Sequence, residues 1–226
     1  MSDIKSTVSD VLTIISDLRG ESSVNTDASR IRAVSRANKD FAKRRFWKFY
    51  RREDTDTGDG GNDYTVGDAT NPARFKGLSE VFVNGTTEDR RHEIVDLNKY
   101  KSIYNSNNSY RMAYEYYDEA NDIIKMYINP APATGATINY TYYWTPPTLT
   151  STTDAVICPN NRIIALLALA DLLEGEEEIN KARAYKEEAE QLIGEIEGID
   201  SSPAVNQIYT MGSIENSVRD RGIGSY

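Results

Sequence analysis

The chain has 226 residues, enough to bury one substantial core or two small ones. Its net charge of −9 argues against a general nucleic-acid-binding protein, and its one cysteine, Cys158, excludes an intrachain disulfide and with it the disulfide-stapled secreted class. No basic-then-apolar leader opens the sequence and no uncharged apolar run reaches membrane-spanning length, so we expect a soluble protein made in the cytoplasm, without a membrane partner.

Apolar residues at three- and four-residue spacings predict two helices near the N-terminus. The first covers Ser2–Leu18, with Gly20 as its terminator. The second is capped near Thr26 and runs to about Tyr50. It includes most of the basic segment Arg30–Arg52, in which ten Lys and Arg residues accompany a single acid.

The stretch Arg52–Pro72 is rich in Asp, Gly and Asn, and its lack of a core pattern predicts a polar loop. Within it, Asp54–Asp63 resembles a calcium-binding loop. An EF-hand requires ligands at positions one, three and five and glycine at six, whereas counting from Asp54 puts Gly58 at five and Asp59 at six. A solvated acidic loop is therefore favoured over a calcium site.

From Leu78 the hydrophobic period changes to two, which predicts strands. Asn84-Gly85 is a hairpin-turn signal between the first two of them. The many tyrosines of this region could stack on sugars or bases, but at strand spacing sheet packing is the more ordinary explanation. The expected elements are strands at Leu78–Val83 and Arg91–Leu97, a helical turn at Asn98–Asn105, a polar loop at Asn105–Ser109, and strands at Arg111–Tyr117, Asp122–Ile128 and Ala136–Trp144.

Two further helical segments are expected within Cys158–Ile196, opened by Pro159, which fits a first helical turn. Between Ile163 and Leu173 the run is apolar almost all round, as in a buried helix. Farther on, apolar residues at helical spacing alternate with many glutamates, which is typical of an amphipathic helix with one wet face. After Gly198 the pattern fades into a partly apolar segment of a kind that often orders on a partner.

Together these patterns predict an α+β protein. A helical bundle, made of two N-terminal helices and the long C-terminal helices, carries an inserted small antiparallel β-sandwich or barrel and an extended C-terminal tail. The expected parts are a helix pair at 1–52, a polar loop at 53–72, a β domain at 73–147, C-terminal helices at 148–198 and a C-terminal arm at 199–226.

No residue pattern indicates an enzyme. The single histidine, His92, has no nucleophile nearby in the sequence, so a surface or interface position is favoured. Cys158 has no histidine close by and is interpreted as a small buried residue. Neither Cys–His metal spacing nor a Walker-type phosphate loop is present, so we expect no catalytic residues, no metal site and no cofactor.

The basic segment Arg30–Arg52 has two interpretations. It could contact phosphates, or it could pair with the acidic helix Glu174–Glu197 of the same or of a neighbouring subunit. Protein contact is favoured because the rest of the chain is acidic and repels DNA.

Four stretches, taken in order, carry a resemblance to a known family. They are RANKDFAKRRFWKF (Arg36–Phe49), the strand and proline pair TINYTYYWTPPTLT (Thr137–Thr150), the acid-containing link STTDAVICPN (Ser151–Asn160) and the helical RIIALLALADLLEGEEEINKARAYKEEAEQLIGEIEG (Arg162–Gly198). In this layout the chain resembles the head–tail adaptor (connector, or neck) proteins of tailed bacteriophages.

The resemblance implies a virion protein that assembles as a ring of twelve subunits beneath the portal of the DNA-filled head. Such a ring would extend the DNA channel, let DNA pass during genome ejection without sequence-specific binding, and present a docking surface. The implied partners are other copies of the chain, the portal protein and the tail or nozzle proteins. Members of this family commonly use a terminal arm to grip the portal.

On this resemblance, three groups of residues are expected to make contacts. The basic helix would contact the next subunit or the portal through Arg36, Lys39, Lys43, Arg44, Arg45 and Lys48. The acidic lumen or intersubunit face would be formed by Glu176, Glu177, Glu178, Glu187 and Glu188. The arm would make contacts through Ile208, Tyr209, Met211, Ile214 and Tyr226. Reversing Lys43, Arg44 and Arg45 to Glu is expected to abolish assembly while leaving the monomer folded.

Two other functions stay open. A small DNA-binding module using residues 30–52 would bind duplex DNA in a salt-sensitive way. A carbohydrate- or surface-binding β domain would use the tyrosine-rich sheet as an exposed aromatic platform and bind glycans as a monomer.

Overall fold

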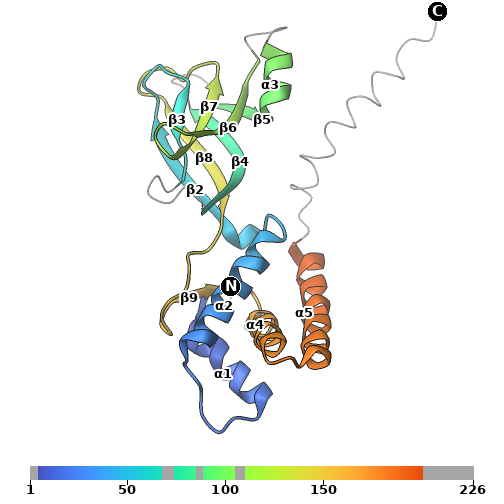
Figure 1. Ribbon diagram of the computed structural model, residues 1–226. Coiled ribbons are helices and arrows are strands. Elements are labelled where there is room, and N and C mark those ends of the chain that lie inside the picture. Colours follow the sequence, from blue (N-terminus) through green and yellow to red (C-terminus); the bar gives the residue numbers. More distant parts are fainter. Residues whose placement is uncertain (1–4, 68–73, 85–88, 105–109, 201–226) are drawn as a thin grey trace, which may run out of the picture.

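The computed structural model describes residues 5–67, 74–84, 89–104 and 110–200, which form a helical part and a β part placed end to end (Figure 1). The helical part contains α1 (Val8–Arg19), α2 (Ala28–Lys43), α4 (Asn161–Gly175), α5 (Ile179–Asp200) and the two short strands β1 (Lys5–Thr7) and β9 (Ala155–Ile157). The β part contains β2 (Arg51–Thr57), β3 (Asp63–Thr65), β4 (Phe75–Asn84), β5 (Asp89–Ile94), α3 (Leu97–Tyr104), β6 (Met112–Asp118), β7 (Ile123–Asn129) and β8 (Thr137–Trp144). A short 3-10 helix, η1 (Lys48–Tyr50), leads from one part to the other.

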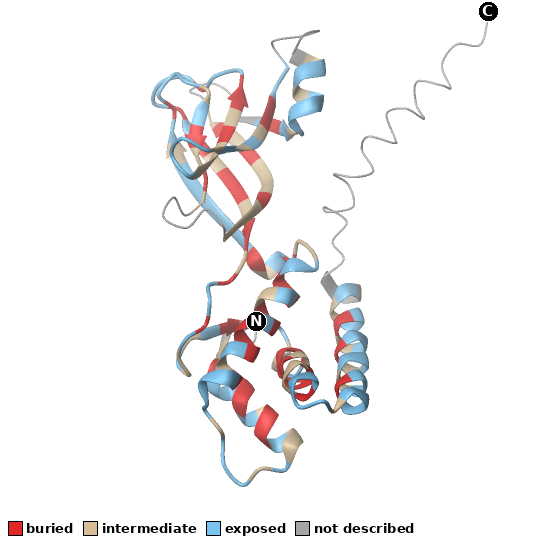
Figure 2. Cartoon of the chain, viewed as in Figure 1, coloured by how far each residue is buried: buried red, intermediate tan, exposed pale blue. Residues whose placement is uncertain are grey.

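Helix α4 lies at the centre of the helical part, in contact with α1, α2 and α5. Its apolar residues face all sides, and Figure 2 shows it buried along most of its length. This confirms the expectation of a buried helix from the run Ile163–Leu173, since a helix without a polar face must be covered on every side. It starts at Asn161, capped by the Asn160 side chain, so Pro159 lies just before the helix and not in its first turn.

The N-terminal helix starts later than Ser2–Leu18 predicted. Residues Lys5–Thr7 form β1, which pairs antiparallel with β9, a strand that the sequence analysis missed. Thr7 then caps α1 in a capping box with Asp10, because the Thr7 backbone N–H donates to the Asp10 carboxylate at 2.8 Å. Gly20 ends the helix with a φ of 68°, as expected for a glycine terminator.

Helix α2 ends at Lys43, well before the predicted Tyr50, because the aromatic residues after it must turn back to reach the core. Trp47 is fully buried, stacks on Phe41 at 4.8 Å between ring centroids, and donates its indole N–H to the Phe41 carbonyl at 2.9 Å. Tyr50 is also buried and donates to the Ile157 carbonyl at 2.6 Å. In a continuous helix Trp47 would lie six residues after Phe41, a rotation of about 240° about the axis, so the two rings could not stack.

The β part is a nearly closed sheet with the strand order β2-β8-β4-β5-β6-β7-β3. Strands β4 and β5 pair as the predicted hairpin, strands β6, β7 and β8 lie where alternation predicted them, and α3 corresponds to the expected helical turn. The expectation of an antiparallel sheet is wrong at one place, where β5 and β6 pair in parallel. Helix α3 connects these two strands, as a parallel connection requires a crossover. The core of this part contains Tyr64, Val66, Val81, Val83, Ala113, Met126, Ile128, Ala136, Ile138 and Tyr140.

The expected polar loop at 53–72 is also partly wrong, because β2 and β3 lie within this stretch. Strand β2 pairs along its whole length with β8, from Arg51 opposite Tyr143 to Thr57 opposite Thr137. It is an edge strand with mostly exposed side chains, which explains why no hydrophobic alternation marks it. The loop expected at Asn105–Ser109 and the arm expected at 199–226 lie outside the described residues, apart from the end of α5.

Candidate assembly surfaces

The basic side of α2 faces acidic residues of the same chain. Arg36 donates to Asp171 of α4 at 3.0 Å through Nε, and Arg44 donates to Glu190 of α5 at 2.6 Å. The Arg44–Glu190 hydrogen bond lowers the pKa of the Glu190 carboxyl and raises the pKa of the Arg44 guanidinium. Of the two partners that the sequence left open, the structure therefore shows these arginines paired within one subunit.

The remaining predicted cations of this segment differ in their surroundings. Arg45 reaches Glu197 of α5 at 3.9 Å, and Lys39 donates to the Thr148 hydroxyl at 2.5 Å. The side chains of Lys43 and Lys48 are both exposed.

The five glutamates of the predicted acidic face also differ in whether they are paired within the chain. Glu188 accepts from Arg162 of α4 at 2.8 Å, and Glu178 pairs with Lys181 one turn farther along α5 at 2.5 Å. Glu177 and Glu187 are exposed, and neither forms an ion pair within the described part of the chain. These two carboxylates, rather than all five predicted ones, are available to a neighbour.

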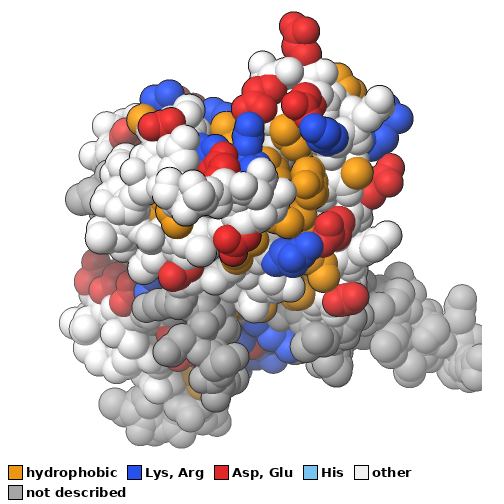
Figure 3. All heavy atoms as spheres, turned by 90° about the horizontal axis from the view of Figure 1, so that it is seen from below, with side chains coloured by type: hydrophobic (Ala, Val, Ile, Leu, Met, Phe, Trp, Pro, Cys, Tyr) orange, Lys and Arg blue, Asp and Glu red, His pale blue; other side chains and the backbone are white. Residues whose placement is uncertain are grey.

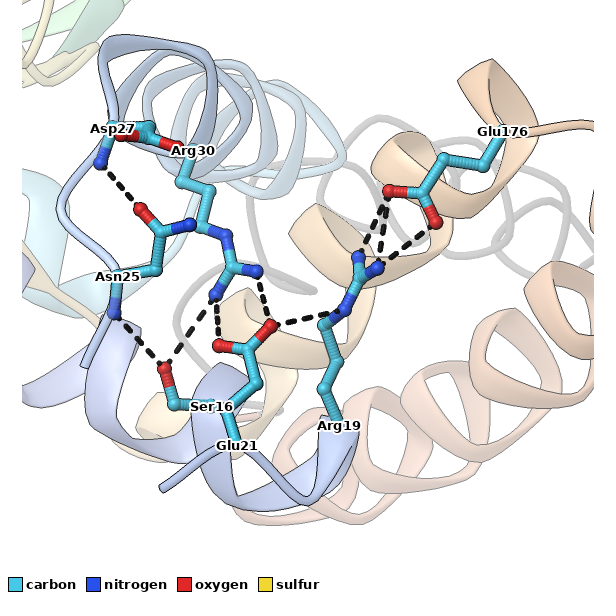
Figure 4. Close-up of polar contacts among 7 residues, drawn as sticks. All are labelled: Ser16, Arg19, Glu21, Asn25, Asp27, Arg30 and Glu176. Atoms are coloured by element: carbon cyan, nitrogen blue, oxygen red, sulfur yellow. Dashed lines mark hydrogen bonds and ion pairs between the residues drawn. The ribbon is translucent and has the colours of Figure 1, made fainter. Parts of the chain in front are cut away.

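Glu176 belongs to a polar network that closes the far end of the helical part (Figure 4). Arg19, the last residue of α1, donates through both terminal nitrogens to Glu176 at the α4–α5 turn, at 2.9–3.1 Å. The same guanidinium lies 3.3 Å from Glu21 in the α1–α2 loop. Because hydrogen bonding to Glu176 favours the charged form, it raises the pKa of Arg19. The loop and the turn are thereby held together.

Arg30 anchors the other side of this network from a buried position. Only 8% of its side chain is exposed, and its guanidinium donates to both oxygens of Glu21, at 2.7 Å for one of them. The hydrogen bonds from Arg30 lower the pKa of the Glu21 carboxyl. This pair was not predicted, although Arg30 precedes the buried Ala33 and Val34 by three and four residues, which places it on the apolar face of α2.

The same end of the helical part carries an exposed hydrophobic area. Figure 3 views the molecule from this end and shows hydrophobic side chains gathered in a strip with Lys, Arg, Asp and Glu around it. Val24 of the α1–α2 loop is 40% exposed and Ile179 at the start of α5 is 52% exposed. Apolar area with a charged rim is the usual composition of a protein-contact surface.

Lys76 of β4 connects the β part to the end of α2. Its ammonium donates to the carbonyls of Ala42 at 2.8 Å and Arg45 at 2.5 Å, and it lies 4.8 Å from the centre of the Phe46 ring. The Ala42 carbonyl lies in the last turn of α2, where carbonyls have no partner within the helix, so Lys76 serves as a distant C-terminal cap. The Arg45 carbonyl lies just beyond the helix and also accepts from the Trp47 N–H at 3.1 Å. Burial lowers the pKa of Lys76. No pattern in the sequence indicates this contact.

The tyrosine-rich sheet packs its rings against one another. Tyr114 stacks on Tyr127 at 5.2 Å between centroids, and Tyr100 of α3 lies 4.6 Å from Tyr114. Tyr116 donates its hydroxyl to Asp63 at 2.8 Å. The packing explanation therefore accounts for these rings, while Tyr117 remains half exposed.

The two candidate reactive side chains are both buried. His92 is 3% exposed, so its expected surface position is wrong: it lies on β5 opposite Val81, on the covered side of the sheet. Cys158 is 3% exposed, as predicted, and burial raises the pKa of its thiol to about 12. No group of three or more His, Cys, Asp or Glu side chains within the described residues could hold a metal ion.

Two features complete the comparison with the predicted sites. The arm residues Ile208, Tyr209, Met211, Ile214 and Tyr226 lie outside the described residues. Among the described helices, none combines the length and apolarity needed to span a bilayer.

Comparison with known proteins gives one family. No curated protein matches the sequence. The model of the SU10 adaptor protein family matches residues 2–208, which is nearly the whole chain and includes both the helical part and the β part. This confirms the resemblance to phage head–tail adaptors: the chain belongs to the SU10 adaptor protein family and is a structural adaptor of a bacteriophage.

Proposed function

We propose that this protein forms a ring beneath the portal of the DNA-filled head, extends the DNA channel and presents a docking surface to the tail or nozzle proteins. The observation that carries the proposal is the family match over residues 2–208. The subunit would occupy the neck of the virion, and the resemblance to other head–tail adaptors sets the expected number of copies at twelve.

The two-part architecture supports a role between two partners. The helical end and the β end face opposite directions, so each can bind a different neighbour in the particle (Figure 1). The helical end has the hydrophobic strip, and the network around Arg19 and Glu21 holds the loop and turn at that end in place. Lys76 fixes the β part on α2. A rigid subunit with two separate ends suits an adaptor.

Contact between neighbouring subunits is proposed to use exposed charges of opposite sign. Lys43 and Lys48 are exposed near the end of α2, while Glu177 in the α4–α5 turn and Glu187 on α5 are exposed. Subunits of a ring meet through two different surfaces, so a basic area on one side can face an acidic area on the next subunit. Arg36, Arg44 and Arg45 already form ion pairs within the subunit, so the proposed contact does not use them.

The DNA channel and the arm complete the proposal. A subunit with a net charge of −9 repels phosphates, so DNA can slide through the ring without being held. The segment 199–226, with its scattered apolar residues, is proposed to grip the portal.

Negative-stain electron microscopy of the purified protein, alone and mixed with the portal protein of the same phage, tests the proposal. We expect rings, or an added layer beneath the portal. A protein that stays monomeric and ignores the portal would contradict the proposed function. Salt-sensitive duplex binding by that monomer would favour the DNA-binding alternative instead.

A double variant tests the contact between subunits. Lys43→Glu with Lys48→Glu should prevent ring formation, whereas Lys101→Glu with Arg111→Glu, which changes the net charge by the same amount at exposed sites of the β part, should not. Arg44 and Arg45 are left unchanged because their reversal would break ion pairs within the subunit. Circular dichroism checks that both variants fold. Normal rings from the Lys43/Lys48 variant would refute this contact.

A further inference from the structure

A pocket of about 240 Å³ opens where the β part meets the helical part. It is lined by Arg52 of β2, Tyr142 and Trp144 of β8, and the neighbouring Arg74 and Phe75 at the start of β4. Arg52 is the last residue of the basic segment but not one of its six named contact residues, and Arg74 lies outside that segment. The pocket therefore needs an explanation of its own.

The pocket brings two positive charges onto one aromatic ring. The guanidinium carbons of Arg52 and Arg74 each lie 4.4 Å from the centre of the Trp144 ring. Within the described residues, Arg52 forms no ion pair with a carboxylate, in contrast to its neighbour Arg51, which binds Glu80 at 2.8 Å. The Arg52 guanidinium, placed over an aromatic ring, keeps N–H groups available to a planar acceptor, whereas Arg74 donates through Nε to the Thr145 carbonyl at 3.3 Å.

Trp144 lines the pocket with its ring, while its indole N–H is buried. Trp144 is 7% exposed, and its Nε1 has no acceptor among the residues that the structure describes. The other tryptophan of the chain differs, since Trp47 donates to the Phe41 carbonyl at 2.9 Å. Buried donors in native proteins nearly always have a partner, so the hydrogen bonding around Trp144 is incomplete within the described residues.

We propose that this pocket binds a carboxylate side chain of an acidic segment presented by a partner protein. Guanidinium groups recognise carboxylates through paired hydrogen bonds, and arginine and tryptophan are the residues most often found at the energetic centres of interfaces. A DNA phosphate fits less well, because the duplex would bring its other phosphates against Glu53 and Asp54, which follow Arg52 on the exposed strand β2.

The inference does not depend on ring formation, and its test uses the full-length protein by itself. Hexaglutamate is the probe, hexaglutamine is its neutral counterpart, and a short duplex oligonucleotide tests for phosphate binding, all at constant ionic strength. Fluorescein-labelled hexaglutamate reports binding to the unaltered chain by anisotropy. In a Trp47→Phe variant, Trp144 is the only tryptophan and its emission reports whether the probe reaches the pocket.

We expect saturable hexaglutamate binding that changes Trp144 emission and weakens about tenfold or more in Arg52→Gln, since a hydrogen bond to a charged group is lost. Arg32→Gln, which removes an exposed arginine of α2 away from the pocket, is the matched control and should bind like the unaltered chain. Equal affinities of the two variants, or equal binding of hexaglutamine, would overturn the proposal. Saturation by the oligonucleotide alone would overturn it in favour of a nucleic-acid phosphate. Trp47 is fully buried, so folding of the Trp47→Phe variant is checked first by circular dichroism. If this variant does not fold, the anisotropy of labelled hexaglutamate with the unaltered chain and with Arg52→Gln decides the question.

Discussion

Replacing Glu21 by glutamine removes the charge that neutralises the buried guanidinium of Arg30. Loss of one partner from a fully buried ion pair costs about 3–5 kcal/mol, because the other charge is left buried alone. Here 8% of the Arg30 side chain and 27% of the Glu21 side chain are exposed, so water partly screens the pair. We therefore expect Glu21→Gln to lower the free energy of unfolding by about 2–3 kcal/mol.

Urea unfolding at pH 7, followed by circular dichroism, measures this effect. The matched control is Glu178→Gln, which should change the free energy of unfolding far less, because the Glu178–Lys181 pair leaves 70% of the lysine side chain exposed to water. Replacing Arg30 by methionine in the Glu21→Gln background should recover most of the loss, because the buried charge is gone. Equal costs for the two single variants would refute the reasoning.

The pH dependence of the unaltered chain gives a second measure of the same interaction. The pKa of Glu21 is lowered in the folded state, so its stabilising contribution is present above the ordinary glutamate pKa of about 4.3. It is lost as the pH falls through the lower folded value. The Glu21→Gln variant should lack this part of the acid sensitivity.

Three further predictions concern other parts of the molecule. Lys76→Met should destabilise the fold by about 1–3 kcal/mol in urea unfolding, because the Ala42 carbonyl loses its donor and the Arg45 carbonyl keeps only the Trp47 N–H; an unchanged midpoint would contradict the capping role. Hydrogen bonds from Lys125 and Asn121 lower the pKa of Asp118 to about 2. Asp118 should therefore stabilise the fold above about pH 4 and cease to do so as the pH falls toward 2. The melting temperature of Asp118→Asn should consequently depend less on pH across this window than that of the unaltered chain. Cys158, with a thiol pKa of about 12, should react with iodoacetamide at pH 8 roughly a hundredfold or more slowly in the native protein than in urea, and equal rates would show that the thiol is accessible.

Hydrophobic periodicity predicted the elements whose burial follows a regular pattern. The all-apolar run Ile163–Leu173 became the central helix α4, and the alternation in Ala136–Trp144 became β8. In each case the spacing of apolar residues along the chain determines which face of the helix or strand is buried, so the local sequence is enough to predict the element.

The elements that were missed depend on distant partners. Strand β2 shows no alternation of apolar and polar residues, because its side chains are mostly exposed. Its backbone is held by pairing with β8, which lies at the other end of the β part in the sequence. The early end of α2 at Lys43 depends on the core surface that Trp47 must reach, and the parallel pairing of β5 with β6 depends on the crossover through α3. The spacing of apolar residues along the sequence does not determine which strands pair or where α2 ends.

The candidate sites were predicted less well than the fold for the same reason. The sequence identified a basic segment and an acidic helix, but it left open whether they meet within or between subunits. Arg44 and Glu190 meet within the chain, whereas the buried pair of Arg30 with Glu21 and the pocket around Trp144 went unnoticed. Charge patterns show which groups exist, and only the fold shows which of them remain available.

The pairing of β1 with β9 also determines the order in which the newly made chain can fold. Ser6 donates to Asn161 at 2.7 Å across 155 residues, so the helical core cannot close until α4 has left the ribosome. All seven strands of the large sheet lie between α2 and β9, and they can pair while α4 and α5 are still being synthesised. During this interval the apolar faces of α1 and α2 are uncovered, and they are the part of the nascent chain that most needs protection by a chaperone.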